Sequence, residues 1–304
     1  LEDILFPEQL AFVLDPASFK TGCCSRRSGK TISCAADLIK TAHDTRGVVC
    51  LYITLSRNNA KKIIWTELKK LNRDYKLSGI ANESDLSITF PNDSIIYCSG
   101  ASDRSEIEKF RGLALKKCYI DESQSFPSYI EDLIDEVIAP ALLDHGGTLA
   151  LIGTPGPLPS GFFYNCTRSS EWSHHSRTFF QNPFIVEKSG LPHQELLQRE
   201  LKRRGVTVDH PSVQREFFGK WVLDSDSLVF HYDAVVNDYA ELPKGSYTYI
   251  LGADIGYKDA DALALLAWSE TDRCTYLVEE QITRRQGIDE LAESIATKGL
   301  LHPI

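Results

Sequence analysis

The sequence lacks several features that would place it in other classes of protein. Its 304 residues include no methionine, whereas a natural protein of this length is expected to contain several. It contains no apolar run long enough to cross a membrane, and its N-terminus lacks the basic and then apolar segments of a signal peptide. We therefore expect no membrane among its partners.

The cysteines and the charge balance exclude two further classes. None of the eight cysteines forms a C-x-x-C pair, and Cys50, Cys98, Cys118 and Cys274 fall within or beside apolar, strand-like runs. Buried free thiols are therefore favoured over disulfides or a zinc site. The formal net charge of −9 excludes a generally basic nucleic-acid-binding surface, but it leaves room for a local basic patch.

Length and hydrophobic pattern predict two domains, the first of the α/β class. A chain of 304 residues exceeds one typical domain. Residues 48–55 and 148–152 are apolar runs typical of fully buried strands, and helical patterns lie between them. Residues 87–90 and 94–98 have the pattern of a β-hairpin. This alternation predicts a mostly parallel sheet covered on both faces.

A phosphate-binding loop is indicated just before a helical segment, residues 32–42. A tight loop that opens a helix directs backbone N–H groups and the positive end of the helix dipole at one point. Gly29 allows an anion to approach, Lys30 can reach the β- and γ-phosphates, and Thr31 can ligate Mg²⁺. The P-loop pattern has glycine where this chain has Cys24, so a plain basic loop remains the alternative. The predicted nucleotide-binding residues are Ser25, Arg26, Arg27, Ser28, Gly29, Lys30 and Thr31.

Residues at the ends of two later strands complete a candidate ATP site. Residues 118–121 end in Asp121, the acid that a P-loop needs on a neighbouring strand to hold Mg²⁺. The next residue, Glu122, is placed to polarise an attacking water. Thr154 follows the strand predicted at 148–152, and the carboxyl ends of parallel strands line the ligand crevice. We therefore expect Thr154 to face the γ-phosphate.

These motifs and their order resemble large terminase subunits, the DNA-packaging motors of tailed bacteriophages. The resemblance covers most of the chain, and its specificity lies in the combination, because no single motif suffices. In that family the first P-loop position often departs from glycine and an arginine precedes Gly-Lys-Thr, as it does here. Residues 215–221 are also similar to the segment that links motor and nuclease. The matching motifs are Phe6-Pro7-Glu8-Gln9, Ser25-Arg26-Arg27-Ser28-Gly29-Lys30-Thr31, Phe110-Arg111-Gly112, Ile120-Asp121-Glu122 and Gly153-Thr154-Pro155.

The resemblance implies how the chain would bind ATP and Mg²⁺. Gln9 would contact the adenine base. Lys30 and Thr31 would bind phosphate and Mg²⁺, and Asp121 would complete the metal site.

It also implies which residues would act on the bound nucleotide. Glu122 would activate the water, and Thr154 would couple hydrolysis to movement. Arg26 would act in cis on the γ-phosphate. Arg111 would be an arginine finger that reaches a neighbouring subunit in a ring, although a salt bridge unrelated to phosphate is an equal alternative for this residue.

The second domain resembles the start of a ribonuclease-H-like nuclease. Asp254 lies at the centre of a first strand, and two antiparallel strands and a helix follow. Such sites hold two divalent metals, Mg²⁺ or Mn²⁺, between carboxylates. The second acid is expected on the strand after residues 286–300, beyond Ile304, so we expect an incomplete nuclease domain that does not cut DNA. Asp259, Asp261 and Glu279 are nearby acids more typical of turn or surface charges.

The predicted organisation is a RecA/ASCE-like P-loop ATPase domain (residues 1–210), a linker (211–245) and the N-terminal part of the nuclease domain (246–304). The implied partners are double-stranded DNA, the portal protein, the small terminase subunit and further copies of the chain in a ring, in the cytoplasm of an infected bacterial host. Two basic helices are candidates for DNA contact, although a solvated helix face is the simpler interpretation of both. Their residues are Lys61, Lys62, Lys69, Lys70 and Arg73, and Lys202, Arg203 and Arg204.

Two alternatives fit part of this pattern. A DExD/H-type helicase would share Gln9, the P-loop and Asp121-Glu122-Ser123-Gln124, but it needs a second RecA-like domain. The strand that carries Asp254, followed by a meander, disfavours such a domain. A P-loop that binds nucleotide only as a structural switch is disfavoured by Glu122, which is of use only for hydrolysis.

Overall fold

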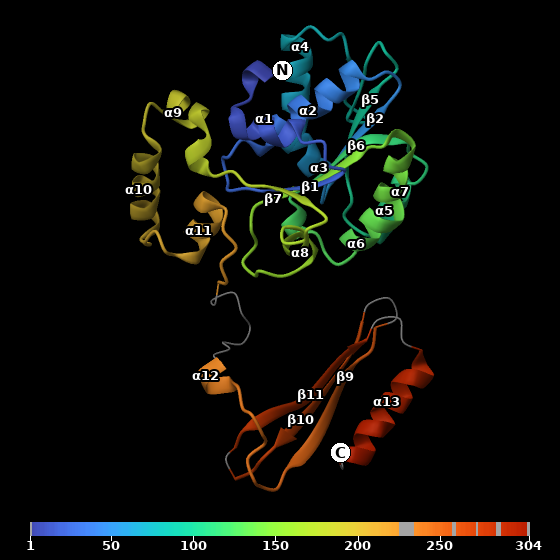
Figure 1. Cartoon of the computed structure of the whole chain (residues 1–304), viewed down its shortest axis with the longest axis vertical. Helices are drawn as coiled ribbons and strands as arrows, with labels where there is room; N and C mark the ends of the chain where they lie inside the picture. Colours follow the sequence, from blue (N-terminus) through green and yellow to red (C-terminus); the bar gives the residue numbers. More distant parts are fainter. Residues whose placement is uncertain (1, 225–233, 257–259, 272, 284–286, 303–304) are drawn as a thin grey trace. The chain divides into compact units, whose positions relative to one another are not determined.

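The chain forms two compact units, Leu1–Val229 and Phe230–Ile304. The computed structural model describes residues 2–224, 234–256, 260–271, 273–283 and 287–302 (Figure 1). The division falls within residues 211–245, where the sequence predicts a linker. The first eight of those residues form helix α11 (Pro211–Phe218), whose Val213 is fully buried in the first unit.

The first unit is built on an eight-stranded sheet of order β3-β4-β5-β2-β6-β7-β1-β8. The pairs from β5 through to β8 are parallel, whereas β3, β4 and β5 pair antiparallel. The predicted mostly parallel sheet and the predicted hairpin are thus confirmed. The strands are β1 (Phe19–Cys23), β2 (Val49–Thr54), β3 (Ile80–Asn82), β4 (Ser87–Thr89), β5 (Ile95–Gly100), β6 (Leu115–Asp121), β7 (Thr148–Gly153) and β8 (Ser173–His175).

Helices cover the sheet and continue to one side of it. Two π-helical turns, η2 (Lys61–Trp65) and η5 (Leu133–Ile138), join α3 to α4 and α6 to α7 into longer helices. The other α-helices of this unit are α1 (Pro7–Leu14), α2 (Lys30–Asp44), α3 (Arg57–Ala60), α4 (Thr66–Asp74), α5 (Arg104–Ile107), α6 (Ile130–Asp132), α7 (Ala139–Leu142), α8 (Phe162–Cys166), α9 (Pro183–Ser189) and α10 (His193–Arg204). The 3₁₀ turns are η1 (Glu2–Ile4), η3 (Glu108–Phe110), η4 (Ser123–Ser125), η6 (Leu143–His145) and η7 (Phe179–Gln181).

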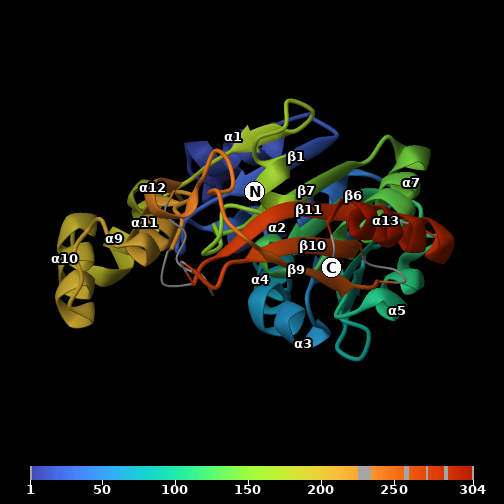
Figure 2. The same ribbon diagram turned by 90° about the horizontal axis from the view of Figure 1, so that it is seen from below.

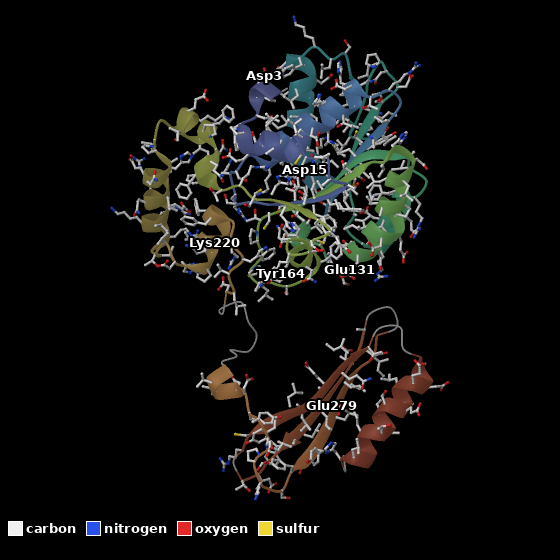
Figure 3. All side chains as sticks on the ribbon, viewed as in Figure 1. Asp3, Asp15, Glu131, Tyr164, Lys220 and Glu279 are labelled. Carbon is white, nitrogen blue, oxygen red and sulfur yellow. The ribbon has the colours of Figure 1, made fainter. Side chains whose placement is uncertain are left out.

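Alternation along the central strands produces two apolar cores, one on each face of the sheet. In β2, Cys50 and Tyr52 join the core made with α1, α2 and α4, whereas Leu51 and Ile53 join the core made with η5, α7 and α8. Successive strand side chains point to opposite faces, so an all-apolar strand is buried from both sides. Side chains fill the space between the sheet and the helices in Figure 3.

Helices α9, α10 and α11 lie together beside the sheet in both views (Figures 1 and 2). A third, smaller core of Leu197, Leu201 and Val213 joins α10 to α11, with aromatic rings of residues 180, 217 and 218 packed against it. These two helices therefore have a packing centre of their own within the first unit.

The second unit contains the three strands and the helix that the sequence predicts. Strands β9 (Thr248–Asp254), β10 (Asp261–Trp268) and β11 (Thr275–Thr283) form an antiparallel sheet of order β11-β10-β9, and α13 (Ile288–Leu301) follows. A short helix, α12 (Ala234–Asn237), precedes them. Over the described residues this is an antiparallel meander and not the parallel sheet of a RecA-like domain, as the sequence pattern predicts.

The cysteine prediction is confirmed except at one position. The residues Cys23, Cys24, Cys34, Cys50, Cys98, Cys118 and Cys166 are buried free thiols. Cys274 is exposed, so the expectation of burial is wrong there. It precedes β11 at a turn, and the apolar run beside it does not cover it. Within the part of the chain that the structure describes, no helix is long and apolar enough to span a bilayer.

Candidate nucleotide-binding site

The predicted P-loop lies between the end of β1 and the start of α2, at the carboxyl edge of the sheet. Gly29 precedes the helix with φ +77°, a left-handed conformation that glycine adopts without steric cost. A Cβ at this position would lie 2.5 Å from Nε2 of Gln9. Both the backbone angle and the packing therefore require glycine at position 29.

Cys24 shows why the loop does without its other usual glycine. Its side chain is fully buried, and φ at this residue is not in the left-handed region. Its N–H donates to the carbonyl of Gly153 at the end of β7 at 3.0 Å. A side chain is thus accommodated at this position, and the departure from the P-loop pattern leaves the loop geometry intact.

The side chain of Gln9 supports the P-loop through a hydrogen bond to Gly29. The side chain is fully buried, its Nε2 donates to the carbonyl of Gly29 at 2.7 Å, and its Oε1 accepts from the N–H of Phe6 at 3.2 Å. Both ends of the amide are therefore bonded to the chain itself. The adenine contact expected of Gln9 remains a prediction, and the observed contact makes this residue a brace for the P-loop.

Lys30 joins the loop to the end of β7. Its Nζ donates to the carbonyl of Ser25 at 2.9 Å and to Oγ1 of Thr154 at 2.9 Å. The structure thus brings together two predicted site residues that are 124 positions apart in the sequence. Thr31, the predicted hydroxyl ligand, follows on the first turn of α2 and is partly exposed.

Asp121 and Glu122 end β6 beside this loop. Asp121 is buried, its Oδ1 accepts from the N–H of Glu122 at 2.8 Å, and its Oδ2 accepts from the hydroxyl of Tyr52. Burial raises the pKa of the Asp121 carboxyl, and the charge of Glu122 adds to the rise. The Tyr52 hydrogen bond and the charge of Lys30 oppose it. Burial, with the Asp121 charge, raises the pKa of Tyr52, so its hydroxyl remains a donor.

Glu122 has φ +57°, an uncommon conformation for a residue with a side chain. Such strain costs of order 1–3 kcal/mol and is found mostly at functional sites, where the surrounding structure enforces it. Here the strained turn leads from β6 into η4 and leaves the Glu122 carboxylate partly exposed at the edge of the sheet.

Gln124 was not among the predicted site residues, yet it connects two of them. Its Nε2 donates to Oε2 of Glu122 at 2.6 Å, and its Oε1 accepts from the N–H of Thr154 at 3.2 Å. A Cβ on Gly153 would lie 2.2 Å from that same oxygen. The glycine therefore makes room for the amide. A continuous chain of hydrogen bonds runs from Lys30 through Thr154 and Gln124 to Glu122.

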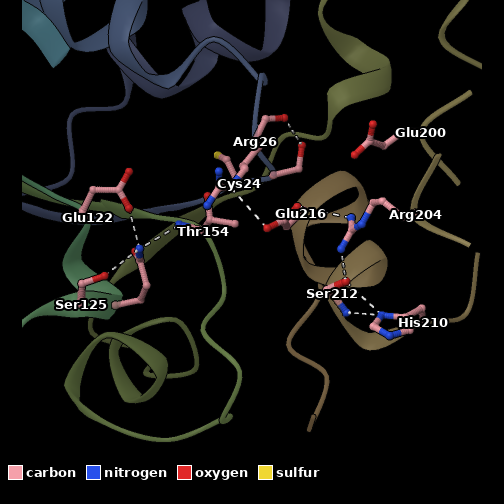
Figure 4. A network of polar contacts seen from close by, with 12 residues as sticks. Cys24, Arg26, Glu122, Ser125, Thr154, Glu200, Arg204, His210, Ser212 and Glu216 are labelled. Carbon is pink, nitrogen blue, oxygen red and sulfur yellow. Dashed lines mark hydrogen bonds and ion pairs between the residues drawn. The ribbon is translucent and has the colours of Figure 1, made fainter. Parts of the chain in front are cut away.

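The opposite side of the loop contacts α11 and the segment before η7 (Figure 4). In Figure 4, Glu122 and Thr154 lie on one side of Cys24, and Glu216 and Arg204 lie on the other. Three loop N–H groups donate to backbone carbonyls: Cys24 to Gly153 at 3.0 Å, Ser25 to Arg177 at 2.9 Å, and Arg26 to Glu216 at 2.8 Å. Sequence reasoning missed the contacts to Arg177 and Glu216, because these residues lie about 150 and 190 positions from Ser25 and Arg26 and local spacing does not indicate that they meet.

The exposed side chain of Arg26 pairs with Glu216, at 3.5 Å from Nε to Oε1. The other carboxylate oxygen of Glu216 lies 3.6 Å from Nη1 of Arg204. Glu216 therefore bridges the P-loop arginine and helix α10.

Two further hydrogen bonds stabilise the loop. Within it, Oγ of Ser28 donates to the carbonyl of Ser25 at 2.9 Å. The carbonyl of Arg27, a left-handed residue, accepts from Asn182 at 2.7 Å.

The side chain of Arg111 forms ion pairs with two glutamates. Its Nε pairs with Glu108 at 2.5 Å, and its Nη2 pairs with Glu136 at 3.3 Å. This is the salt bridge that the sequence left as the alternative, and the role in a neighbouring subunit remains a prediction.

The predicted nuclease residue, Asp254, is exposed and is the last residue of β9 in the second unit, so its expected place at the centre of the strand is wrong. Asp261 is buried, and its Oδ1 accepts from the N–H of Gly256 at 2.9 Å, so of the two roles expected of it, a turn or a surface charge, the surface charge is wrong. Glu279 pairs with Lys298. Over the described residues no three His, Cys, Asp or Glu side chains are grouped as metal ligands. Asp259 lies outside the described residues.

Charge pairing reduces the free positive charge of both basic helices. Lys61 and Lys69 both pair with Glu83, at 3.9 Å and 2.5 Å. On α10, Arg203 pairs with Glu200 at 2.5 Å, and Arg204 faces Glu216. These contacts fit the simpler interpretation of the two helices as solvated faces.

The geometry defines a P-loop α/β domain, with a lysine, a threonine and two carboxylates placed around one loop. No protein-family profile and no curated protein matches the sequence. Among solved structures, the large terminase of a thermophilic bacteriophage is similar, with a TM-score of 0.58, 19% identity, and coverage of 96% of this chain and 73% of that one.

Two further structures are similar to this chain. The large terminase of bacteriophage HK97 has a TM-score of 0.58 and 15% identity, and the match covers 89% of this chain and 62% of that one. The ATPase domain of the Thermus phage P74-26 large terminase has a TM-score of 0.56 and 17% identity, and the match covers 72% of this chain and 94% of that domain. The chain therefore has the fold of large terminase subunits. The large terminase of the thermophilic bacteriophage has also been solved with ADP and with ATP-gamma-S.

Proposed function

We propose that this chain is the ATP-driven motor subunit that moves double-stranded viral DNA into a procapsid. The terminase fold supports the class of protein. The observation that carries the proposal is the hydrogen-bonded chain from Lys30 through Thr154 and Gln124 to Glu122, directly beside Asp121. It connects a phosphate-binding lysine, a strand-end hydroxyl and a water-polarising carboxylate within one domain.

The donor set around the P-loop suits a magnesium nucleotide. The hydroxyl of Thr31 and the carboxylate of Asp121 are hard oxygen donors of the kind Mg²⁺ prefers, and they would hold it. When bound, the ion neutralises charge on the phosphates. Lys30 binds the β- and γ-phosphates in this proposal, and the hydrogen bond from Gln9 holds Gly29 in its left-handed conformation at the start of α2.

Glu122 is the residue that we assign to water activation, because it projects from a strained turn next to Asp121. Gln124 fixes its carboxylate. Thr154 contacts both Lys30 and Gln124, so a change in the γ-phosphate position would move the end of β7. Arg26 would turn from Glu216 to the phosphates in cis, and Arg111 would act on a neighbouring subunit in a ring.

The proposed function also involves the second unit and partner molecules. Asp254 would be the first acid of a two-metal nuclease that uses Mg²⁺ or Mn²⁺. The partners of the chain would be double-stranded DNA, the portal protein and the small terminase subunit, in the cytoplasm of an infected bacterium. Lys62 and Lys70 would add positive charge for DNA on the helix that contains η2 and α4.

The test is the rate of ATP turnover by the native chain and by Glu122→Gln. Loss of a general base costs roughly 10²–10⁴-fold in rate, so we expect at least a 100-fold fall with ATP-gamma-S affinity changed less than about threefold. Glu187→Gln, a change at an exposed acid on α9, is the matched control and leaves turnover unchanged. Equal rates for the native chain and Glu122→Gln would reject the assignment. Separation of a forked duplex by the native chain would support a helicase instead.

A further inference from the structure

Tyr52 contacts Asp121 from the neighbouring strand. Its side chain is fully buried on the face of the sheet that packs against α2, and its hydroxyl donates to Oδ2 of Asp121. The other carboxylate oxygen, Oδ1, accepts from the N–H of Glu122. Both oxygens of the predicted magnesium ligand therefore have a donor, one from the backbone directly after β6 and one from a side chain of β2.

Strand register explains why this contact forms. β2 and β6 are parallel neighbours, with Tyr52 opposite Tyr119. Asp121 is two residues beyond Tyr119 and therefore lies on the same face of the sheet. A tyrosine side chain that leans along the strand direction reaches this position, whereas the shorter side chains of β2 do not.

The same pair of strands contains a matched contact away from the P-loop. The hydroxyl of Tyr119 donates to Oδ2 of Asp37, a residue in the middle of α2, and Oδ1 of Asp37 pairs with Lys117 at 2.6 Å. Both tyrosines are fully buried, and both donate to a buried aspartate. The two contacts differ chiefly in which aspartate receives the hydrogen bond.

We propose that Tyr52 is a positioning residue for the magnesium site, whose hydroxyl fixes the orientation of the Asp121 carboxylate. This assignment rests on the function proposed above. A carboxylate that binds a metal is usually oriented by a second hydrogen-bonding partner, and loss of that partner typically lowers metal affinity 10–100-fold. Tyr119 has no such role, because Asp37 lies outside the nucleotide site.

The experiment measures binding of ATP-gamma-S by the whole chain in EDTA and across a Mg²⁺ titration, for the native protein, Tyr52→Phe and Tyr119→Phe. We expect Tyr52→Phe to need about tenfold more Mg²⁺ for half-maximal enhancement of binding, with binding in EDTA unchanged. We expect Tyr119→Phe to follow the native titration. Both substitutions remove a buried hydrogen bond, so urea unfolding would show a similar loss of stability in each.

Three outcomes would overturn the assignment. The first is a native Mg²⁺ requirement in Tyr52→Phe, and the second is an equal rise of the Mg²⁺ requirement in both variants. The third is weaker binding of ATP-gamma-S by Tyr52→Phe in EDTA as well. A native chain that binds no nucleotide in either condition would instead reject the proposed function, and this assignment with it. Should Tyr52→Phe fail to fold, Tyr52→Leu removes the same hydroxyl and is compared with Tyr119→Leu in the same titration.

Discussion

At the scale of single residues, the two ends of the P-loop have different requirements. Cys24 is buried with an ordinary backbone conformation, whereas Gly29 has φ +77° and contacts Gln9. A side chain is therefore tolerated at the first position and excluded at the second. The sequence pattern alone treats both as glycine positions, and only the backbone conformation distinguishes them.

Replacing Cys24 by glycine restores the usual pattern, but we expect it to lower stability. The substitution adds backbone freedom to the unfolded chain and removes a buried side chain, which together cost about 1–2 kcal/mol. ATP-gamma-S affinity changes less than about threefold, because the loop N–H groups keep their partners. Urea unfolding and nucleotide titration measure the two quantities.

Gly29→Ala is the contrasting variant. It forces a side chain into the left-handed region and against the Gln9 amide, so nucleotide affinity falls together with stability. A gain of nucleotide affinity in Cys24→Gly, or normal affinity in Gly29→Ala, would contradict this account of the loop.

At the scale of elements, α11 acts as a support for the P-loop. The helix ends at Gly219, which has φ +65° and lies against Ser25, where a Cβ would be 3.1 Å from the Ser25 nitrogen. One turn earlier, the Glu216 carbonyl accepts from the N–H of Arg26. Beyond the helix, the N–H of Asp224 donates to the carbonyl of Pro157 at 3.0 Å, close to the end of β7. The segment after α10 therefore contacts both the P-loop and the loop that follows β7.

We expect Gly219→Ala to lower both stability and nucleotide affinity. A left-handed alanine costs about 1–2 kcal/mol, and the added methyl group displaces the backbone around Ser25. Gly190→Ala is the matched control, because Gly190 also ends a helix with φ +67°, but a Cβ there would have nothing within 4 Å of it. It should lose a similar amount of stability with unchanged affinity for ATP-gamma-S. Equal affinity for ATP-gamma-S in the two variants would show that α11 does not support the P-loop.

At the scale of the whole molecule, the first unit contains every element of the proposed nucleotide site. Its three apolar cores draw on residues between Ile4 and Trp221. The match to the isolated P74-26 ATPase domain covers 72% of this chain and 94% of that domain. The nucleotide site therefore depends on residues of the first unit.

A chain that ends at Asp224 should fold and bind ATP-gamma-S as the full chain does, within about twofold, because a domain with its own core folds as a unit. Circular dichroism on heating and nucleotide titration check this. A chain that ends at Arg204 also lacks α11, and we expect it to bind nucleotide more weakly. Full affinity in the shorter chain would contradict the assignment of support to α11, and unfolding of the longer one would contradict the independent folding of the first unit.

The sequence was sufficient where the signal is local. The P-loop lysine, the paired acids after β6 and the threonine after β7 each belong to a motif that directly follows an apolar strand. Periodicity therefore places them at the same edge of the sheet. The meander around Asp254 was predicted for the same reason. Cys274 was misplaced, because an apolar neighbourhood in sequence does not guarantee cover at a turn.

The tertiary structure decided which residues hold the site in place. Tyr52 reaches Asp121 across 69 positions, Gln124 reaches Thr154 across 30, and Glu216 meets Arg26 only because α11 packs beside the loop. No motif indicates these contacts, since a hydrogen bond between distant segments depends on register and packing and leaves no trace in local spacing. The sequence determined the chemical groups of the proposed nucleotide site, and the packing of distant segments determined how those groups are oriented.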